Sequence, residues 1–251
     1  MTLGLRVPGD RGAWLSIEGV TETDVADSSS LAPQPGPARP LRGVITDWGG
    51  VMTGPIIETV TAWLDADGID QASYRTVMRA WVAQAYAGGD AVSPIRALER
   101  GECTEAEFER QLAEQLVRID GGAVLPEGLL ARMFAASEYD HVMHDLIRAA
   151  RQAGLRTGLL SNSWGGGYPR DLFPELFDAV VISAEVGMRK PEPGIFRLAA
   201  ELLELEPGEC VFIDDIEENI RAAEAVGLVG VHHRDAGQTT ARIRELLGIS
   251  G

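Results

Sequence analysis

The sequence predicts an α/β fold, a doubly wound parallel sheet with an all-helical subdomain inserted after its first strand. Short apolar runs near residues 43–46, 157–160, 179–182, 211–213 and 229–231 supply the strands, and most of them alternate with helical segments. The stretch 56–140 has helical periodicity with no strand signal inside it. A chain of 251 residues, 45% of them hydrophobic, is long enough to bury a full core.

The first element follows an unusual N-terminal stretch. Residues 1–40 are rich in Ser and Pro and poor in apolar periodicity, which predicts a flexible extension of unknown role. The run 43–46 then ends at Asp47 and is followed by a glycine-rich turn. Open α/β sheets place their ligands at the carboxyl ends of their strands. A lone aspartate at such an end can also simply cap the next helix or turn. Whether Asp47 belongs to a ligand site therefore depends on the residues at the other strand ends.

The helical block comes next, over residues 56–140. Tyr74, Val77, Met78 and Trp81 recur at helical spacing, so they form an apolar stripe. Thr104 opens a capping-box pattern that starts another helix. The aromatic side chains of this block, Tyr74 among them, are expected to form its core and not a substrate platform. The core domain is therefore predicted at 41–55 and 141–251, with the helical block as a separate subdomain.

Alternation of strands and helices resumes after residue 140. Helices are expected to end near Arg151, Leu203 and Val226, each a few residues before the next strand. The helix after Pro193 carries its apolar residues on one face. This order gives parallel strands joined by helical crossovers.

Charge and cysteine content narrow the class of protein. The chain has 38 acidic and 22 basic residues, a formal charge of −16, which argues against nucleic acid and anionic membranes as partners. Cys103 and Cys210 form no CxxC pair and are expected to be reduced, buried thiols. With no apolar run of membrane-spanning length and no signal-peptide pattern, a cytoplasmic location is expected. Monomer and homodimer stay equally open.

Polar side chains follow four of the predicted strands. They are Asp47, the pair Ser161-Asn162, Lys190 in a longer loop, and the pair Asp214-Asp215. Each has an ordinary structural explanation, such as a turn cap, a solvated lysine or a helix cap. Their recurrence at the same edge of one sheet predicts a single site instead.

The chemistry of that set is phosphoryl transfer through an aspartate. A carboxylate attacks phosphorus and forms an aspartyl-phosphate, so one difficult step becomes two easier ones. The anions repel each other, and Mg²⁺ held by Asp47 and the acidic pair would offset this repulsion. Lys190 and the Ser161 hydroxyl would stabilise charge on the transferring oxygens.

Four segments, in order, resemble the motifs of the haloacid dehalogenase-like superfamily over roughly residues 41–235. Val44-Ile45-Thr46-Asp47 resembles motif I, and Leu159-Leu160-Ser161-Asn162 resembles motif II. The stretches 184–196 and 212–219 are similar to motif III of subfamily I and to motif IV. The helical block resembles the C1 cap of this family's subfamily IA, in the branch with the phosphatase domain of soluble epoxide hydrolase.

The resemblance implies a role for each residue. Asp47 would be the nucleophile, with Ser161 and Lys190 as the other catalytic residues. The substrate would lie against Trp48, Gly49, Ser161, Asn162 and Lys190. Magnesium would be held by Asp47, the backbone carbonyl of Gly49 and the acidic pair, with Asp215 as the direct ligand, Asp214 in support or reaching the metal, and Asn219 supporting.

One position departs from the family pattern. Family phosphatases carry a second Asp two residues after the nucleophile as general acid and base, and here that residue is Gly49. The bacterial α-glucose-1-phosphatase branch, which this chain resembles in its Asp-x-Gly motif, acts on sugar phosphates without it. Dehalogenases also lack it but use no metal, so the acidic pair points away from them.

The predicted function is therefore a Mg²⁺-dependent hydrolase of a small phosphorylated metabolite, a sugar phosphate or similar. A catalytically weak binding or regulatory protein and a dehalogenase-type hydrolase remain as alternatives. The substrate and the cap residues that select it are not predicted.

Overall fold

The computed structural model describes residues 40–86 and 93–249. The predicted N-terminal extension therefore lies almost wholly outside the described residues. The division into extension, cap and core stays a prediction, although helices begin at both expected junctions, at Ile56 and at His141. None of the helices in the described ranges is long and apolar enough to cross a membrane.

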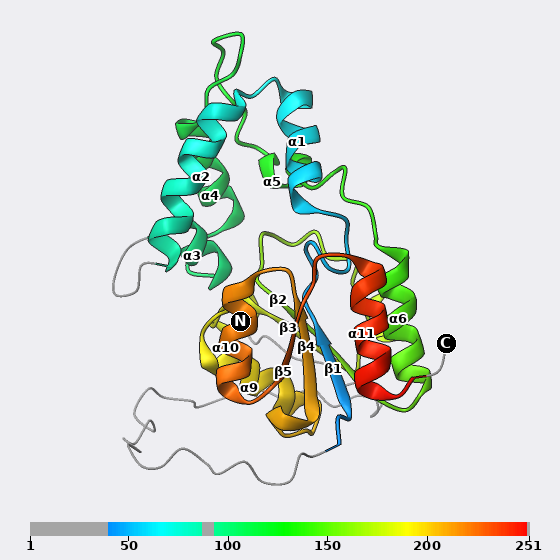
Figure 1. The fold of residues 1–251 in the computed structure, drawn as a ribbon. Helices are drawn as coiled ribbons and strands as arrows, with labels where there is room; N and C mark the ends of the chain where they lie inside the picture. Colours follow the sequence, from blue (N-terminus) through cyan, green and yellow to red (C-terminus); the bar gives the residue numbers. More distant parts are fainter. Residues whose placement is uncertain (1–39, 87–92, 250–251) are drawn as a thin grey trace, which may run out of the picture.

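A five-stranded parallel sheet forms the centre of the molecule (Figure 1). Its strands are β1 (Gly43–Thr46), β2 (Arg156–Ser161), β3 (Ala179–Ile182), β4 (Cys210–Asp214) and β5 (Val229–His232), in the order β3-β2-β1-β4-β5. In the register of the central strands, Thr46 pairs with Leu159 on one side and with Ile213 on the other. The carboxyl ends of β1, β2 and β4 therefore lie next to one another.

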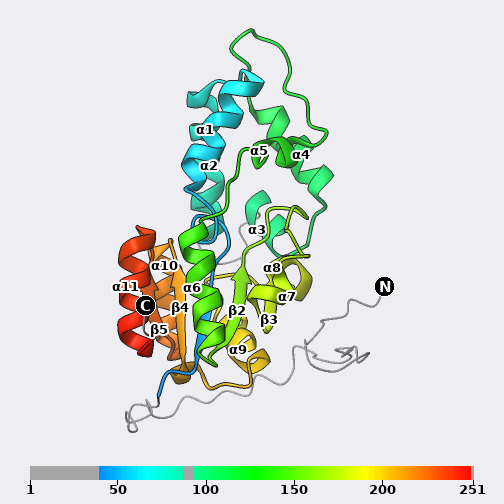
Figure 2. The ribbon, with the colours of Figure 1, turned by 90° about the vertical axis from the view of Figure 1, so that its right-hand side faces the viewer.

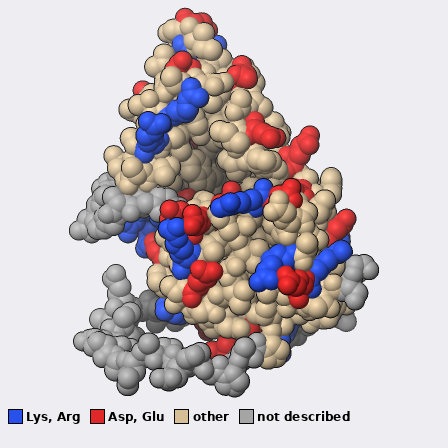
Figure 3. Space-filling model, in the orientation of Figure 1, with Lys and Arg blue, Asp and Glu red and all other residues tan. Residues whose placement is uncertain are grey.

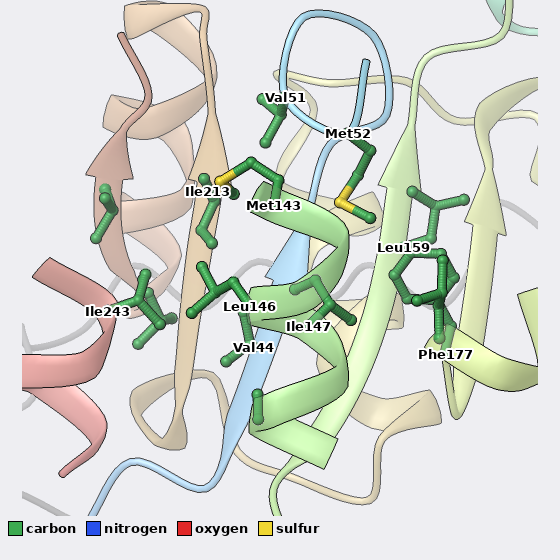
Figure 4. Close-up of a cluster of buried hydrophobic side chains, with 14 of the residues drawn as sticks. Val44, Val51, Met52, Met143, Leu146, Ile147, Leu159, Phe177, Ile213 and Ile243 are labelled. Atoms are coloured by element: carbon green, nitrogen blue, oxygen red, sulfur yellow. The ribbon is translucent and has the colours of Figure 1, made fainter. Parts of the chain in front are cut away.

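Alternate residues of the strands face two separate cores. Val44 packs with Leu159 and Ile213 under α6 (His141–Gln152), α7 (Phe173–Leu176) and α11 (Ala236–Leu247) (Figure 4). Ile45 faces the other side, under α9 (Pro193–Leu202) and α10 (Glu217–Val226). Because both faces are covered, the strands are buried and read as continuous apolar runs.

The described residues between β1 and α6 form five helices, which make up the cap. This block has its own apolar core, which includes Trp63, Phe108 and Leu112. They are α1 (Ile56–Asp67), α2 (Gln71–Tyr86), α3 (Pro94–Glu99), α4 (Glu105–Gln115) and α5 (Leu129–Met133). The capping box at Thr104 is formed, as expected. The cap stands over the carboxyl ends of the strands in both ribbon views (Figures 1 and 2).

The chain enters and leaves the cap at adjacent points. Thr53 pairs with Tyr139 in an isolated antiparallel bridge, and the Gly54 amide donates to the Glu138 carbonyl at 2.9 Å. The core and the cap are thus joined by two segments that run side by side.

The predicted fold class is confirmed, and all five predicted strands are present to within about one residue at each end. Three helices among the described residues went unpredicted, the short α7 and α8 (Ser183–Val186) and the longer α11, together with the 3-10 turn Pro207–Glu209. The expectation of two buried thiols is wrong for Cys103, which is partly exposed, and right for Cys210.

Candidate active site

Asp47 lies at the carboxyl end of the central strand β1. Its amide donates to the Ile213 carbonyl at 2.9 Å, which is the last hydrogen bond between β1 and β4 and fixes the Asp47 backbone. Its carboxylate Oδ1 accepts the Trp48 amide at 2.7 Å. Asp47 is only 7% exposed, so the sheet and the turn together fix both its backbone and its side chain.

The turn after Asp47 depends on a glycine, at position 50. Gly50 has φ +75°, in the left-handed region, and a Cβ there would lie 2.5 Å from Oδ2 of Asp215. Its amide donates to the Thr53 hydroxyl at 3.0 Å, which closes the turn. Only glycine leaves room here for the Asp215 carboxylate.

Lys190 connects the carboxylates of two strands. Its Nζ lies 2.8 Å from Oδ1 of Asp47 and 2.7 Å from Oδ2 of Asp214. The side chain is 1% exposed, and it belongs to the only lysine in the chain. Burial by itself would lower the pKa of this amine, but the two carboxylates outweigh burial and raise it. Lys190 is therefore a fixed positive charge.

Asp214 is a positioning group more than an open ligand. Both of its oxygens accept the Asn219 side-chain amide, at 3.0 and 3.1 Å, and Oδ1 also accepts the Ile216 amide at 2.8 Å. With Lys190 added, each oxygen has at least two donors. Its carboxylate is fully buried and already committed to protein partners.

Asp215, by contrast, is only partly buried. Its carbonyl oxygen lies 3.0 Å from Nε2 of His232, which fixes the backbone and leaves the carboxylate to the cavity. Carboxylate oxygens of Asp47, Asp214 and Asp215 lie within 4.8 Å of one another, the one such acidic, His or Cys group among the described residues. The structure thus brings together the three predicted carboxylate ligands.

The electrostatics of this group fit a divalent cation. Burial raises the pKa of Asp47 to about 7, with Lys190 opposing the shift and the two other carboxylates adding to it. Burial and the Asp214 charge likewise raise the pKa of Asp215. Oδ1 of Asn219 is buried with no hydrogen-bond partner among the described residues. Mg²⁺ prefers carboxylate and amide oxygens such as these, and its charge would offset the remaining repulsion between the carboxylates.

Ser161 and Asn162 end β2 beside this group. The Ser161 hydroxyl is 2.9 Å from the Tyr168 hydroxyl, and burial raises the pKa of that phenol to about 12. The Asn162 side chain exchanges two hydrogen bonds with the backbone of Lys190, at 2.8 and 3.0 Å. Asn162 therefore sets the position of the lysine, in addition to its predicted contact with substrate.

These residues open into one cavity of about 610 Å³ between the sheet edge and the cap. The predicted Asp47, Trp48, Gly49, Ser161, Asn162, Lys190 and Asp215 all line it, and Asp214 lies behind Lys190. The molecular surface is hollowed between its upper and lower parts (Figure 3). Tyr74 packs against the apolar core of the cap, as expected, and also lines the cavity.

Gly49 lies at the junction of core and cap. A Cβ at this position would lie 3.2 Å from Cδ1 of Ile56, the first residue of α1, and its φ is not in the left-handed region. The backbone therefore tolerates a side chain here, and the neighbour is an apolar group at the end of a flexible chain.

Sequence reasoning missed the contacts that fix the cap to this site. Glu99 of the cap pairs with Arg189, beside Lys190, and accepts the Trp164 indole N–H at 3.0 Å. The pair is buried, at 5% and 3% exposure. Arg100 and Glu192 form a second bridge, and the Gly166 amide reaches Glu105 of the cap. No local pattern marks these partners, since each pair joins distant segments.

The comparisons with known proteins agree with this geometry. Residues 41–227 match the family model of haloacid dehalogenase-like hydrolases. The chain is 28% identical over 227 residues to bifunctional epoxide hydrolase 2 of Sus scrofa, covering 84% of this chain and 39% of that protein. It is 30% identical over 158 residues to a sesquiterpene phosphatase of Aspergillus oryzae, covering 60% of this chain and 77% of the relative.

Two solved structures share the fold. A haloacid dehalogenase family enzyme of Bacteroides thetaiotaomicron, in complex with magnesium, has a TM-score of 0.58 at 22% identity, covering 78% of this chain and 94% of its own. A predicted hydrolase of this family from Porphyromonas gingivalis has a TM-score of 0.58 at 24% identity, with coverages of 82% and 98%. The chain spans 19–39% of the length of the first curated relatives it matches. It belongs to the haloacid dehalogenase-like hydrolase family.

Proposed function

We propose that this protein is a Mg²⁺-dependent phosphomonoester hydrolase that works through an aspartyl-phosphate on Asp47. The observation that carries the proposal is the double engagement of one oxygen of that residue. Oδ1 takes both the Trp48 amide and the Lys190 ammonium, at 2.7 and 2.8 Å, which leaves Oδ2 for attack. A carboxylate held in this way loses little further freedom when it reacts.

The reaction proceeds in two displacements. Oδ2 of Asp47 forms a bond to phosphorus, and the bond from phosphorus to the alcohol oxygen breaks. The alcohol oxygen leaves with that electron pair and takes its proton from solvent, because Gly49 offers none. Water then attacks phosphorus, and the bond from phosphorus to Oδ2 breaks with its electron pair returning to Asp47. The attacking water gives its proton to solvent, and inorganic phosphate leaves.

The surrounding groups stabilise the transferred charge. The Lys190 ammonium faces the reacting carboxylate, and the Ser161 hydroxyl lines the same cavity. Asp47 and Asp215 would hold Mg²⁺, which offsets the repulsion between carboxylates and phosphate oxygens. The phosphatase names of relatives such as the Aspergillus oryzae protein are consistent with this function.

The test is the hydrolysis of para-nitrophenyl phosphate with Mg²⁺ by the parent and by Asp47→Asn. The substitution keeps the size and the Trp48 contact but removes the nucleophile, so the rate should fall by about 10³-fold or more. Asp145→Asn is the matched control, because the Asp145 side chain is 77% exposed on α6. It should keep the parental rate.

Other results would overturn the proposal. Substantial activity in a folded Asp47→Asn variant would remove the aspartyl-phosphate. A parent that binds Mg²⁺ but hydrolyses no ester would favour a binding or regulatory role, and one that binds no Mg²⁺ would reopen the dehalogenase alternative.

A further inference from the structure

The cap side of the cavity consists mainly of hydrocarbon. It is formed by Ile56, Val60, Met78, Ile95, Met133 and Phe134, which come from four cap helices and the residue that follows α5. We call this set the cap wall. Several of its members also belong to the apolar core of the cap, so the wall is the part of that core that borders the cavity.

Charged groups are scarce on this side. The only charged side chain that the described cap residues add to the cavity is Glu99, and its two oxygens already hold Arg189 and the Trp164 indole. Hydroxyls come from Tyr74, Ser137 and Tyr139. Among the described residues that line the whole cavity, Lys190 is the sole cation. With the Mg²⁺ of the proposed function, one phosphate head group beside Lys190 is thus all that the cations of the cavity can match.

From this contrast between the charged sheet edge and the apolar cap wall, we infer that the substrate is the phosphate monoester of an apolar alcohol, with its hydrocarbon part against the cap wall. The inference rests on the proposed function and names the substrate class for the same site. A cavity of about 610 Å³ is large enough for a hydrocarbon chain beyond the phosphate.

The physical reason separates this class from sugars. Hydrocarbon buried against the cap wall leaves water, and each methylene is expected to tighten binding about four-fold. A sugar hydroxyl in the same place gives up its hydrogen bonds to water and meets methyl and methylene groups. A second phosphate, as in a bisphosphate, would meet no second cation among the described residues.

The test measures binding without turnover. Calorimetric titration with Mg²⁺ present uses ethyl-, butyl-, hexyl- and octylphosphonate, whose carbon–phosphorus bond this chemistry does not cleave. The dissociation constant should fall roughly 200-fold from ethyl to hexyl. The methylene phosphonate analogue of glucose 1-phosphate should bind no better than ethylphosphonate. Constants that do not change with length, or a glucose analogue as tight as hexylphosphonate, would overturn the inference.

A substitution in the cap wall sharpens the result. Met78→Gln keeps the length of the side chain and adds a polar end, so the dependence on chain length should become shallower, with hexylphosphonate binding weakened more than ethylphosphonate binding. Val82→Gln is a second variant, because Val82 also lines the cavity. At 41% exposure, a polar side chain at this position should not disturb folding. Ile119→Gln is the control, on a cap residue that is 77% exposed and outside the cavity lining.

Hydrolysis of para-nitrophenyl phosphate on the same preparations separates the two claims. Turnover with no dependence of binding on chain length would leave the phosphatase in place and remove the apolar substrate. A steep dependence of binding on chain length without any turnover would support the apolar ligand and contradict the proposed phosphatase reaction. Equal slopes in Met78→Gln, Val82→Gln and the parent would show that the chain does not lie on the cap wall.

Discussion

The cavity has two unlike sides. The side formed by the sheet edge carries Asp47, Lys190 and the acidic pair. There, Oδ1 of Asp47, Nζ of Lys190 and both carboxylate oxygens of Asp214 have partners within 3.1 Å. The cap wall carries hydrocarbon side chains from several helices. Most of the first side comes from residues at the carboxyl ends of strands that pair with each other, and Lys190 comes from the loop after β3. The second side comes from helices that meet only through packing.

The contrast teaches which property each side can control. Asp47, Lys190 and Asp214 hold one another in place, so a change at Lys190 is expected to remove chemistry and stability together. The cap wall is an apolar surface in which volume and polarity can change one residue at a time. For the proposed phosphatase, the type of reaction would thus be set at the sheet edge and the choice of alcohol at the cap.

The largest effect is expected for Lys190→Met, which breaks the sheet-edge side. Without the ammonium, the buried Asp47 and Asp214 carboxylates face each other uncompensated, so unfolding free energy should fall by about 3–5 kcal/mol. Urea denaturation measures the loss, and hydrolysis should fall to background. Combining it with Asp47→Asn should cost less than the sum of the single changes. Additive losses would show that the lysine does not bridge the pair.

A smaller loss is expected where the two sides are joined. Arg189→Met leaves the buried Glu99 carboxylate without its guanidinium and should cost about 3 kcal/mol in thermal or urea unfolding. Arg170→Met removes one partner of an exposed ion pair with Glu185 and should cost less than about 1 kcal/mol. Similar losses in both variants would mean that burial of the Glu99 pair has no energetic consequence.

Magnesium affinity should separate the two members of the acidic pair. Asp215→Asn removes the carboxylate that is open to the cavity, so the dissociation constant for Mg²⁺ should rise by about 10- to 100-fold with little change in stability. Asp214→Asn should affect Mg²⁺ less and stability more, since Asp214 holds Lys190 and Asn219. Calorimetry and denaturation on both variants decide this. Equal or reversed effects on Mg²⁺ would exchange the roles.

The smallest change is expected for Gly49→Asp, which adds the missing acid. The new Cβ meets only the end of the Ile56 side chain, at 3.2 Å, so the variant should fold. Phosphates with poor leaving groups should gain about ten-fold, short of the 10²–10⁴ of an optimised acid. The informative quantity is the slope of log rate against leaving-group pKa. A shallow slope in the parent would mean that another residue supplies the proton.

The sequence predicted one side of the cavity far better than the other. Asp47, Ser161 and the acidic pair lie at the carboxyl ends of strands, and Lys190 lies in the loop after β3. Parallel pairing brings these ends together whatever lies between them in the sequence. Their contacts fit the predicted set, while their catalytic roles stay predictions.

The remaining features depend on contacts between distant segments. Met78 has the same helical spacing as Val77, yet of these two neighbours only Met78 lines the cavity. Periodicity predicts an apolar face but not whether that face meets another helix or a substrate. Tyr168 gave no signal either, because a tyrosine in a glycine-rich loop has no preferred partner until the loop is folded.

The composition of the chain gives Lys190 an unusual property. Among the 22 basic residues it is the only lysine, so the protein carries a single side-chain amine, and that amine is 1% exposed. An amine-specific reagent applied for a short time would modify Lys190 only while the site is open. The rate of that labelling would report how often cap and sheet edge separate, and a bound phosphate would slow it. The lysine that pairs with the two carboxylates is therefore also a native reporter of how often the cavity opens.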